Sequence, residues 1–580
     1  MADPREVLAE RVKDALSAAF GAEYADADPL IRPSQFADFQ ANVALPLARR
    51  LGRPPRDVAA ELARHLDLAG VAGPPEVSGP GFINITLSSD WIAAQASGLL
   101  NDPRLGTASP AAPQTIVVEY SSPNVAKEMH VGHLRTTIVG DALARILDFA
   151  GHRVIRDNHL GDWGTPFGML IEHMLDVGED SAEAGLLITD PNSFYQAARR
   201  KFDSDQVFAE RARSRVVKLQ AGDPDTLRLW QHLVDLSKGY LHRIYRQLGV
   251  TLTDEDIRGE SFYNAMLADV CTDLERLGVA VISDGALCAF PLGFAGRDGE
   301  PLPVIIRKSD GGYNYSTTDL ATIRYRVDEL HVDRAIYVVG SSQALHFQMV
   351  FAVARQAGWI PQGARFEHAQ IGNVLGPDGK LLRTRTGETI KLSALLDESV
   401  ERAAKVVDEL EAGSGVDEHA RKEIAEPVGI GAVKYADLST ALDSEYVFDW
   451  SRMISFKGNT GPYLQYATAR IRSIFRKAGL APEEIAAPIE LTEDAERALA
   501  LRLLGFGAVI SQVAETAEPH KLAAFLFEVA SAFTTFYEQC PVLQAPTDSV
   551  RRSRLALSAL ALRMLTTGLS LLGVPVPERM

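Results

Sequence analysis

The pattern of hydrophobic and polar positions predicts a strand, a loop and a helix between residues 115 and 151. Thr115 to Ser122 is a short β-branched run with a proline on either side, which is typical of a strand. Apolar residues then recur at helical spacing from Leu134 to Ile146, and Gly151 ends the run. The polar loop between them is therefore expected at the end of a strand and the start of a helix.

The same pattern divides the chain into three predicted domains. Residues 1–108 combine an amphipathic helix with an alternating strand that begins at Gly79, as in a small α+β unit. Residues 109–455 alternate strands with helices, which predicts an α/β domain with a Rossmann-like parallel sheet, interrupted by a helical insertion at about 190–275. Residues 456–580 are helical with short breaks at prolines, which predicts an all-α bundle.

Composition is that of a large soluble protein. The chain has 580 residues, of which 46% are hydrophobic and 23% charged, enough to form several cores. No signal peptide is expected at its acidic N-terminus. The apolar stretch 555–572 contains Arg563, which suits a buried helix better than a membrane span. Three scattered cysteines fit a reducing cytoplasm, so we expect a cytoplasmic protein that does not bind membranes.

Net charge alone would not suggest a nucleic-acid partner. The formal charge is −17, and the excess of acidic residues lies before residue 457. Because phosphate binding needs only a local basic surface, RNA remains possible.

The loop before the helix at 134–150 contains His130, Gly132 and His133. Unpaired backbone N–H groups and the positive end of the helix dipole favour an anion there, so a polyphosphate could lie against both imidazoles. Gly132 would let a base or ribose approach the backbone. Taken alone, His-x-x-His is more often a capped helix start with two solvated rings. A zinc site is disfavoured because no third ligand lies at metal spacing.

A second basic segment, Gly376 to Gly387, is rich in glycine and hydroxyl groups. Such a loop can close on a pyrophosphate leaving group and oppose its charge. An exposed basic hairpin turn is the alternative for this segment in isolation.

Residues 119–135 resemble the HIGH signature of class I aminoacyl-tRNA synthetases, and most closely that of the arginyl-tRNA synthetase family. The 376–387 segment is similar in position to the family's KMSKS loop, with Arg383 and Arg385 where lysines would stand. Further matches cover nearly the whole chain, at 160–165, 339–347 and 458–467.

The resemblance implies ligation of L-arginine to tRNA(Arg) through an arginyl-adenylate, with ATP as substrate and Mg²⁺ accompanying pyrophosphate. No metal site in the protein is expected, and the protein is expected to be a monomer. By the family's pattern the catalytic residues would be His130, His133, Lys127, Arg383 and Arg385. ATP would be bound by His130, Gly132, His133, Lys380, Thr384 and Thr386.

A guanidinium is planar, with donors in a fixed fork, so a selective pocket needs carboxylates in its plane and a neutral acceptor. Tyr315 and Asp319 are four residues apart at a helix start and would share one face. The resemblance assigns the guanidinium to these two and Glu119. It assigns the α-amino and carboxylate end to Ser122, Asn124 and Gln343.

The family's N-terminal domain contacts the tRNA elbow, and its C-terminal bundle binds the anticodon. Helical spacing places Arg470 with Lys477 and Arg472 with Arg476 on ridges that could meet phosphates, although solvated helix charge is an equal alternative. Three other functions remain open: an adenylyl- or nucleotidyltransferase, a lysine-activating class I synthetase, and a non-catalytic RNA-binding paralogue.

Overall fold

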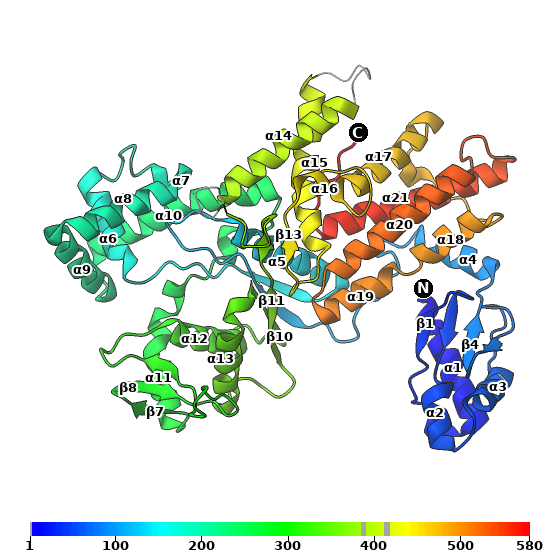
Figure 1. Cartoon of the computed structure of the whole chain (residues 1–580), viewed down its shortest axis with the longest axis horizontal. Coiled ribbons are helices and arrows are strands. Elements are labelled where there is room, and N and C mark those ends of the chain that lie inside the picture. Colours follow the sequence, from blue (N-terminus) through cyan, green and yellow to red (C-terminus); the bar gives the residue numbers. More distant parts are fainter. Residues whose placement is uncertain (1–2, 384–389, 411–417) are drawn as a thin grey trace.

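The computed structural model describes residues 3–383, 390–410 and 418–580. A central parallel sheet carries helical and sheet insertions on one side and a helix bundle on the other, and a small N-terminal unit lies against the bundle (Figure 1). The structure therefore has the predicted α/β class, with an α+β unit before the sheet and helices after it.

The N-terminal unit packs helices on one antiparallel sheet of order β1-β2-β4-β3. Its core consists of the apolar positions of α1 and α3 against Ile83 and Ile85 of β4, all fully buried. The elements are α1 (Pro4–Phe20), β1 (Ile31–Pro33), β2 (Phe39–Ala41), α2 (Ala44–Leu51), α3 (Pro55–His65), β3 (Glu76–Ser78), β4 (Phe82–Ile85) and α4 (Ser89–Leu99).

The central sheet has the order β11-β10-β5-β6, and every neighbouring pair is parallel. Its strands are β5 (Thr115–Glu119), β6 (Arg153–Asp157), β10 (Arg334–Gly340) and β11 (Arg365–Ile371). Ile116 and Val118 of β5 contact the core that includes α5 (Val131–Ala150). Val117 faces a second core with α12 (Tyr315–Asp328) and α13 (Ala344–Gln356). Because the strands are parallel, their carboxyl ends form one edge, where ligands bind in such sheets.

Two insertions follow β6, and both differ from the prediction. Helices begin at Pro166 rather than near residue 190: α6 (Pro166–Val177), α7 (Leu186–Thr189), α8 (Pro191–Ser204), α9 (Gln206–Gln220), α10 (Pro224–Leu248) and α11 (Leu267–Arg276). An antiparallel sheet of β7 (Ala280–Ser283), β8 (Ala286–Ala289) and β9 (Val304–Arg307) then precedes α12. These four-residue strands are too short to give a clear alternating pattern, so the sequence did not predict them.

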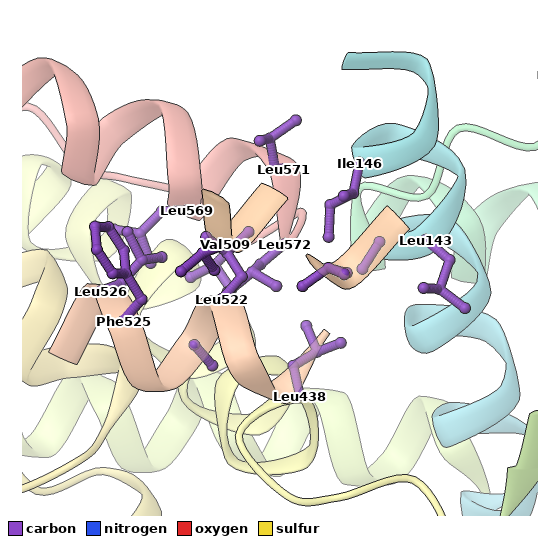
Figure 2. Close-up of a cluster of buried hydrophobic side chains, with 14 of the residues drawn as sticks. Leu143, Ile146, Leu438, Val509, Leu522, Phe525, Leu526, Leu569, Leu571 and Leu572 are labelled. Atoms are coloured by element: carbon purple, nitrogen blue, oxygen red, sulfur yellow. The ribbon is translucent and has the colours of Figure 1, made fainter. Parts of the chain in front are cut away.

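After β11 the chain passes through β12 (Val374–Leu375), which pairs with β13 (Tyr446–Val447). The helices are α14 (Leu392–Leu410), α15 (Glu418–Leu438), α16 (Trp450–Met453), α17 (Gly461–Ala478), α18 (Asp494–Leu503), α19 (Phe506–Thr516), α20 (His520–Gln539) and α21 (Asp548–Leu571). Figure 2 shows Leu143 and Ile146 of α5 in one buried cluster with Leu438, Val509, Leu522 and Leu572. This shared core joins α5 to the bundle.

One described segment, Asp494–Thr516, is long and apolar enough to cross a membrane by length and composition. Half of its apolar window is buried inside the protein, and Gly505 divides it into α18 and α19. Core helices of soluble proteins share this composition.

The N-terminal unit is attached to the bundle by a two-pronged ion pair. Arg497 of α18 donates to both oxygens of Asp38, at 3.0 and 2.6 Å, and to the carbonyl of Leu87 at 2.8 Å. Both side chains are largely buried, so the pair is stronger than a surface salt bridge.

Arg497→Met should loosen this attachment. It removes three charge-assisted bonds and leaves the largely buried Asp38 carboxylate without its cation, which costs about 2 kcal/mol. Proteolysis of the 100–114 connection should then be about thirty-fold faster, because cleavage follows the population of the open form. The control is Arg502→Met on the same helix, whose pair with Glu528 is half-exposed and contributes little. Equal cleavage rates for the two variants would contradict the assignment.

Candidate active site

A cavity of about 590 Å³ opens at the carboxyl edge of the central sheet. It is bounded by the end of β5, the start of α5, the first turn of α12, the residues after β10 and the segment Leu381–Arg383. This is the edge at which parallel α/β sheets bind ligands.

His130 and His133 lie together at the start of α5, with ring centroids 4.0 Å apart. The Nδ1 atom of His130 accepts the N–H of Gly132 at 3.1 Å, and that of His133 accepts the N–H of His130 at 3.1 Å. Burial lowers the pKa of His130 and lowers that of His133 to about 3. Both rings are therefore neutral, and because Nδ1 is an acceptor in each, the proton is on Nε2. Two N–H donors are thus available to phosphate oxygens.

The expectation of unpaired backbone donors at this helix start is wrong. The N–H groups of Val131, Gly132 and His133 already donate to Ile390 O, His130 Nδ1 and His130 O. The reason for a glycine at position 132 is also different from the one expected, because a Cβ there would lie 2.8 Å from the His130 ring. The imidazoles and the helix dipole, rather than the first amides, are what the site offers an anion.

The loop between β5 and α5 is strained. Ser121, Ser122 and Ala126 all have positive φ, at 70°, 47° and 59°, which non-glycine residues rarely adopt and which clusters at functional sites. Across from it, Gly161 lies so near Asn124 that a Cβ would be 2.3 Å from the Asn124 amide oxygen. The 160–165 motif therefore supports Asn124 in the cavity wall.

The six residues expected to hold arginine all line this one cavity: Glu119, Ser122, Asn124, Tyr315, Asp319 and Gln343. Tyr315 and Asp319 share a face of α12 as predicted. His346 touches both of them: its Nε2 is 2.5 Å from Asp319 Oδ2, and its ring centroid is 4.9 Å from that of Tyr315.

Glu119 is more constrained than the sequence suggested. One of its oxygens, Oε2, accepts a 2.5 Å bond from Arg326, and the residue is only 6% exposed. It still borders the cavity. Glu119 therefore cannot offer both of its carboxylate oxygens to a substrate.

Sequence reasoning missed Glu260 and His159, which also line the cavity. Burial raises the pKa of Glu260 to about 7, and Asp162 and Asp319 add to the rise while His159 opposes it. Glu260 follows no spacing pattern, because it begins a short turn far along the chain from the other acids. Only the folded structure brings this titratable group to the site.

Some predicted phosphate-binding residues lie elsewhere. Arg383 lines the cavity, whereas Lys127 is exposed with its ammonium 5.1 Å from the ring centroid of Tyr195 in α8. Lys380 is at the exposed tip of its loop. Thr384, Arg385 and Thr386 lie outside the described residues.

The predicted RNA-binding cations of α17 have two environments. Arg472 donates to the Pro577 carbonyl at 2.8 Å and Arg476 reaches the Glu578 carbonyl at 3.5 Å, so both contact the C-terminal tail. Arg470 lies over the ring of Tyr466 at 4.9 Å. Lys477 is exposed on the same helix.

The cavity is large enough for a nucleotide and holds two neutral imidazoles at the start of α5, which packs on the helix bundle. This combination is found in class I aminoacyl-tRNA synthetases. Family patterns specify it further. The chain matches "tRNA synthetases class I (R), catalytic domain" over residues 95–450, "Arginyl tRNA synthetase N terminal domain" over 6–87 and "DALR anticodon binding domain" over 464–580. The chain belongs to the arginyl-tRNA synthetase family.

Individual relatives agree. An arginine–tRNA ligase from Thermobifida fusca is 64% identical over 580 residues, covering 100% of both chains, and one from Frankia casuarinae is 50% identical over 99% of each. The crystal structure of Plasmodium falciparum arginyl-tRNA synthetase superposes with a TM-score of 0.84 at 28% identity, covering 100% of both chains. The solved structure of Thermus thermophilus arginyl-tRNA synthetase shares the fold, with a TM-score of 0.80 at 24% identity over 99% of this chain and 100% of the other.

His133→Asn tests the imidazole assignment. Asparagine keeps an acceptor where Nδ1 lies, so the helix start and the thermal unfolding midpoint should be preserved. It removes the Nε2 donor, and kcat in ATP–pyrophosphate exchange should fall by roughly two to three orders of magnitude. Near-wild-type turnover in a folded variant would contradict the assignment of the His133 imidazole as a donor to phosphate.

Proposed function

We propose that this cavity forms arginyl-adenylate from L-arginine and ATP and then transfers the arginyl group to the terminal ribose of tRNA(Arg). The protein is an enzyme, an arginine–tRNA ligase of class I, in keeping with its family. The observation that carries the proposal is the placement of three acidic side chains, Glu119, Asp319 and Glu260, beside the paired imidazoles in one cavity. The acids suit a cationic amino acid, and the imidazoles suit a polyphosphate.

In the first step an oxygen of the arginine carboxylate bonds to the α-phosphorus of ATP, and pyrophosphate leaves. In the second a ribose hydroxyl attacks the activated carbonyl and AMP leaves. Neither step needs a nucleophile from the protein. His130 and His133 would donate Nε2–H bonds to phosphate oxygens, and Arg383 would oppose charge on the leaving group. Lys127, Lys380, Thr384, Arg385 and Thr386 remain proposed participants.

Among the residues that the structure describes, no group of three or more His, Cys, Asp and Glu side chains could hold a metal ion. We propose that Mg²⁺ enters with ATP and takes its ligands from the phosphates.

The amino-acid pocket would bind the two ends of arginine with different sets of residues. Asp319, Tyr315 and Glu260 would surround the guanidinium with acceptors, as a planar fork requires. Ser122, Asn124 and Gln343 would hold the α-amino and carboxylate groups. Glu119, with one oxygen already taken, would contribute a single acceptor.

For tRNA, we propose contacts from the N-terminal unit, residues 1–108, and from the bundle, residues 456–580, which lie against each other beside the catalytic domain, residues 109–455 (Figure 1). Arg470 and Lys477 are better placed for phosphates than Arg472 and Arg476, which contact the C-terminal tail. We also propose a monomeric, cytoplasmic enzyme that acts away from membranes.

ATP–pyrophosphate exchange with single amino acids, run with tRNA present, tests the function. Arginine should be the preferred substrate and lysine a poor one. Canavanine, which keeps the guanidinium fork, should be accepted far better than citrulline, which replaces one nitrogen by oxygen. Preferential activation of lysine, or no exchange with any amino acid, would overturn the proposal.

The pH dependence of arginine binding tests Glu260. With a pKa of about 7, the carboxyl group is mostly protonated at pH 6, and a bound guanidinium requires it to ionise. Arginine KM should therefore be constant above pH 8 and rise by up to about ten-fold per unit as pH falls below 7. Glu260→Gln should raise KM at pH 8 and remove this dependence. An unchanged pH profile in that variant would exclude Glu260 from the pocket.

A further inference from the structure

Three side chains on neighbouring strands form a row beneath the cavity. The register pairs Asp157 of β6 with Glu119 of β5, and Glu119 with Tyr337 of β10, so all three project from one face of the sheet. Arg326 of α12 lies against this row and is fully buried. Its Nη2 donates to Glu119 Oε2 at 2.5 Å and to Asp157 Oδ2 at 2.8 Å, and its guanidinium carbon is 4.7 Å from the centre of the Tyr337 ring.

The helix that supplies Arg326 also supplies part of the substrate pocket. Tyr315, Asp319 and Arg326 are separated by four and seven residues, so they lie on one face of α12. The bond from Arg326 to Glu119 thus connects the end of β5 to the helix that carries Asp319. It fixes how far apart these two acidic groups are at the cavity.

Arg326 also supplies the positive charge that the two neighbouring carboxylates need. Glu119 and Asp157 are both buried, and two close carboxylates would not both stay ionised without a cation. Burial raises the pKa of Glu119 and Asp157 adds to the rise, while Arg326 acts against both. By formal charge, the two carboxylates and Arg326 together carry one net negative charge.

We propose that Arg326 is a positioning residue for amino-acid selection: by binding one oxygen of Glu119 it orients the other oxygen toward the cavity as a fixed acceptor for a cationic group of the substrate. The inference rests on the proposed place of Glu119 in the arginine pocket. Glu119 borders the cavity although Oε2 is occupied, so Oε1 is the atom that remains to meet the amino acid. Arg326 itself, with no exposed surface, touches no substrate.

Two variants separate orientation from charge. Arg326→Lys keeps the cation but is shorter and not planar, so it cannot both lie on Tyr337 and bridge two carboxylates. The double variant Asp157→Asn with Arg326→Gln keeps the net charge of the row but removes the bridge. The control is Arg324→Gln: Arg324 is on the same helix, but it pairs with Asp273 at 3.0 Å and lies over Trp359, away from the cavity.

Exchange assays on the full-length protein with tRNA present should show arginine KM raised about ten-fold or more in both Arg326 variants. The KM for ATP should stay within about three-fold of wild type, and the control should match wild type for both substrates. A purely structural role would change both constants together and lower the thermal midpoint. Equal changes in the two KM values, an unchanged arginine KM, or failure of both variants to fold would each overturn the proposal.

Glu119→Gln distinguishes this inference from the function on which it rests. If wild type does not activate arginine, the proposed function fails. If Glu119→Gln leaves arginine KM unchanged, the assignment of Glu119 fails and the positioning role fails with it. If Glu119→Gln raises arginine KM but neither Arg326 variant does, only the positioning role is wrong.

Discussion

The arrangement of the site depends on one buried guanidinium, that of Arg135. It is 1% exposed and lies on α5, two residues after His133. It donates to Asp437 at 2.9 Å, to the carbonyls of Gly372 and Ser444 at 2.8 Å each, and to that of Ala441 at 3.4 Å. Burying a charge is costly unless it is paired, and these four acceptors pair this one. The start of α5, the strand leading into the 376–383 loop and the end of α15 are therefore held in one geometry.

This geometry connects the chemistry to the bundle. Gly372 lies just before the loop that faces the imidazoles, and Asp437 ends the helix that packs on the C-terminal helices. Leu143 and Ile146 of α5 belong to the same apolar core as Val509 of α19 and Leu572 (Figure 2), which adds a non-directional component to the same junction. Apolar burial contributes most of the stability here, whereas the Arg135 bonds set the register. A partner bound to the bundle thus acts on elements that are rigidly joined to the site.

The sequence predicted what local patterns determine. Strands β5 and β10 are β-branched runs, α5 has clear helical spacing, and motif residues such as Asn124 and Gln343 come from short segments whose order fixes their place at the sheet edge. Their convergence in one cavity followed from the parallel sheet. The antiparallel sheet β7–β9 gave no signal, because four-residue strands with mixed burial lack periodicity.

The remaining features could not be predicted because they arise from contacts between distant segments. Arg326 and Glu119 are 207 residues apart. No pattern in either segment indicates that the Arg326 guanidinium binds an oxygen of Glu119. The same holds for Glu260, and for Arg472, whose acceptor is at the far end of the chain. Charged residues in a sequence show which interactions are possible, but only tertiary packing decides which carboxylate receives which cation.

Burial solves a conflict that the two substrates create. An anionic nucleotide and a cationic amino acid must bind side by side, so the groups that hold phosphates must not be captured by the acids that hold arginine. His133 lines the same cavity as Glu119 and Glu260, so a protonated imidazole there would offset the negative charge of the acidic pocket. Burial instead lowers the pKa of His133 to about 3, and its Nδ1 is already used as an acceptor. The imidazole stays a neutral N–H donor, which can stabilise charge on a phosphate without neutralising the acidic pocket.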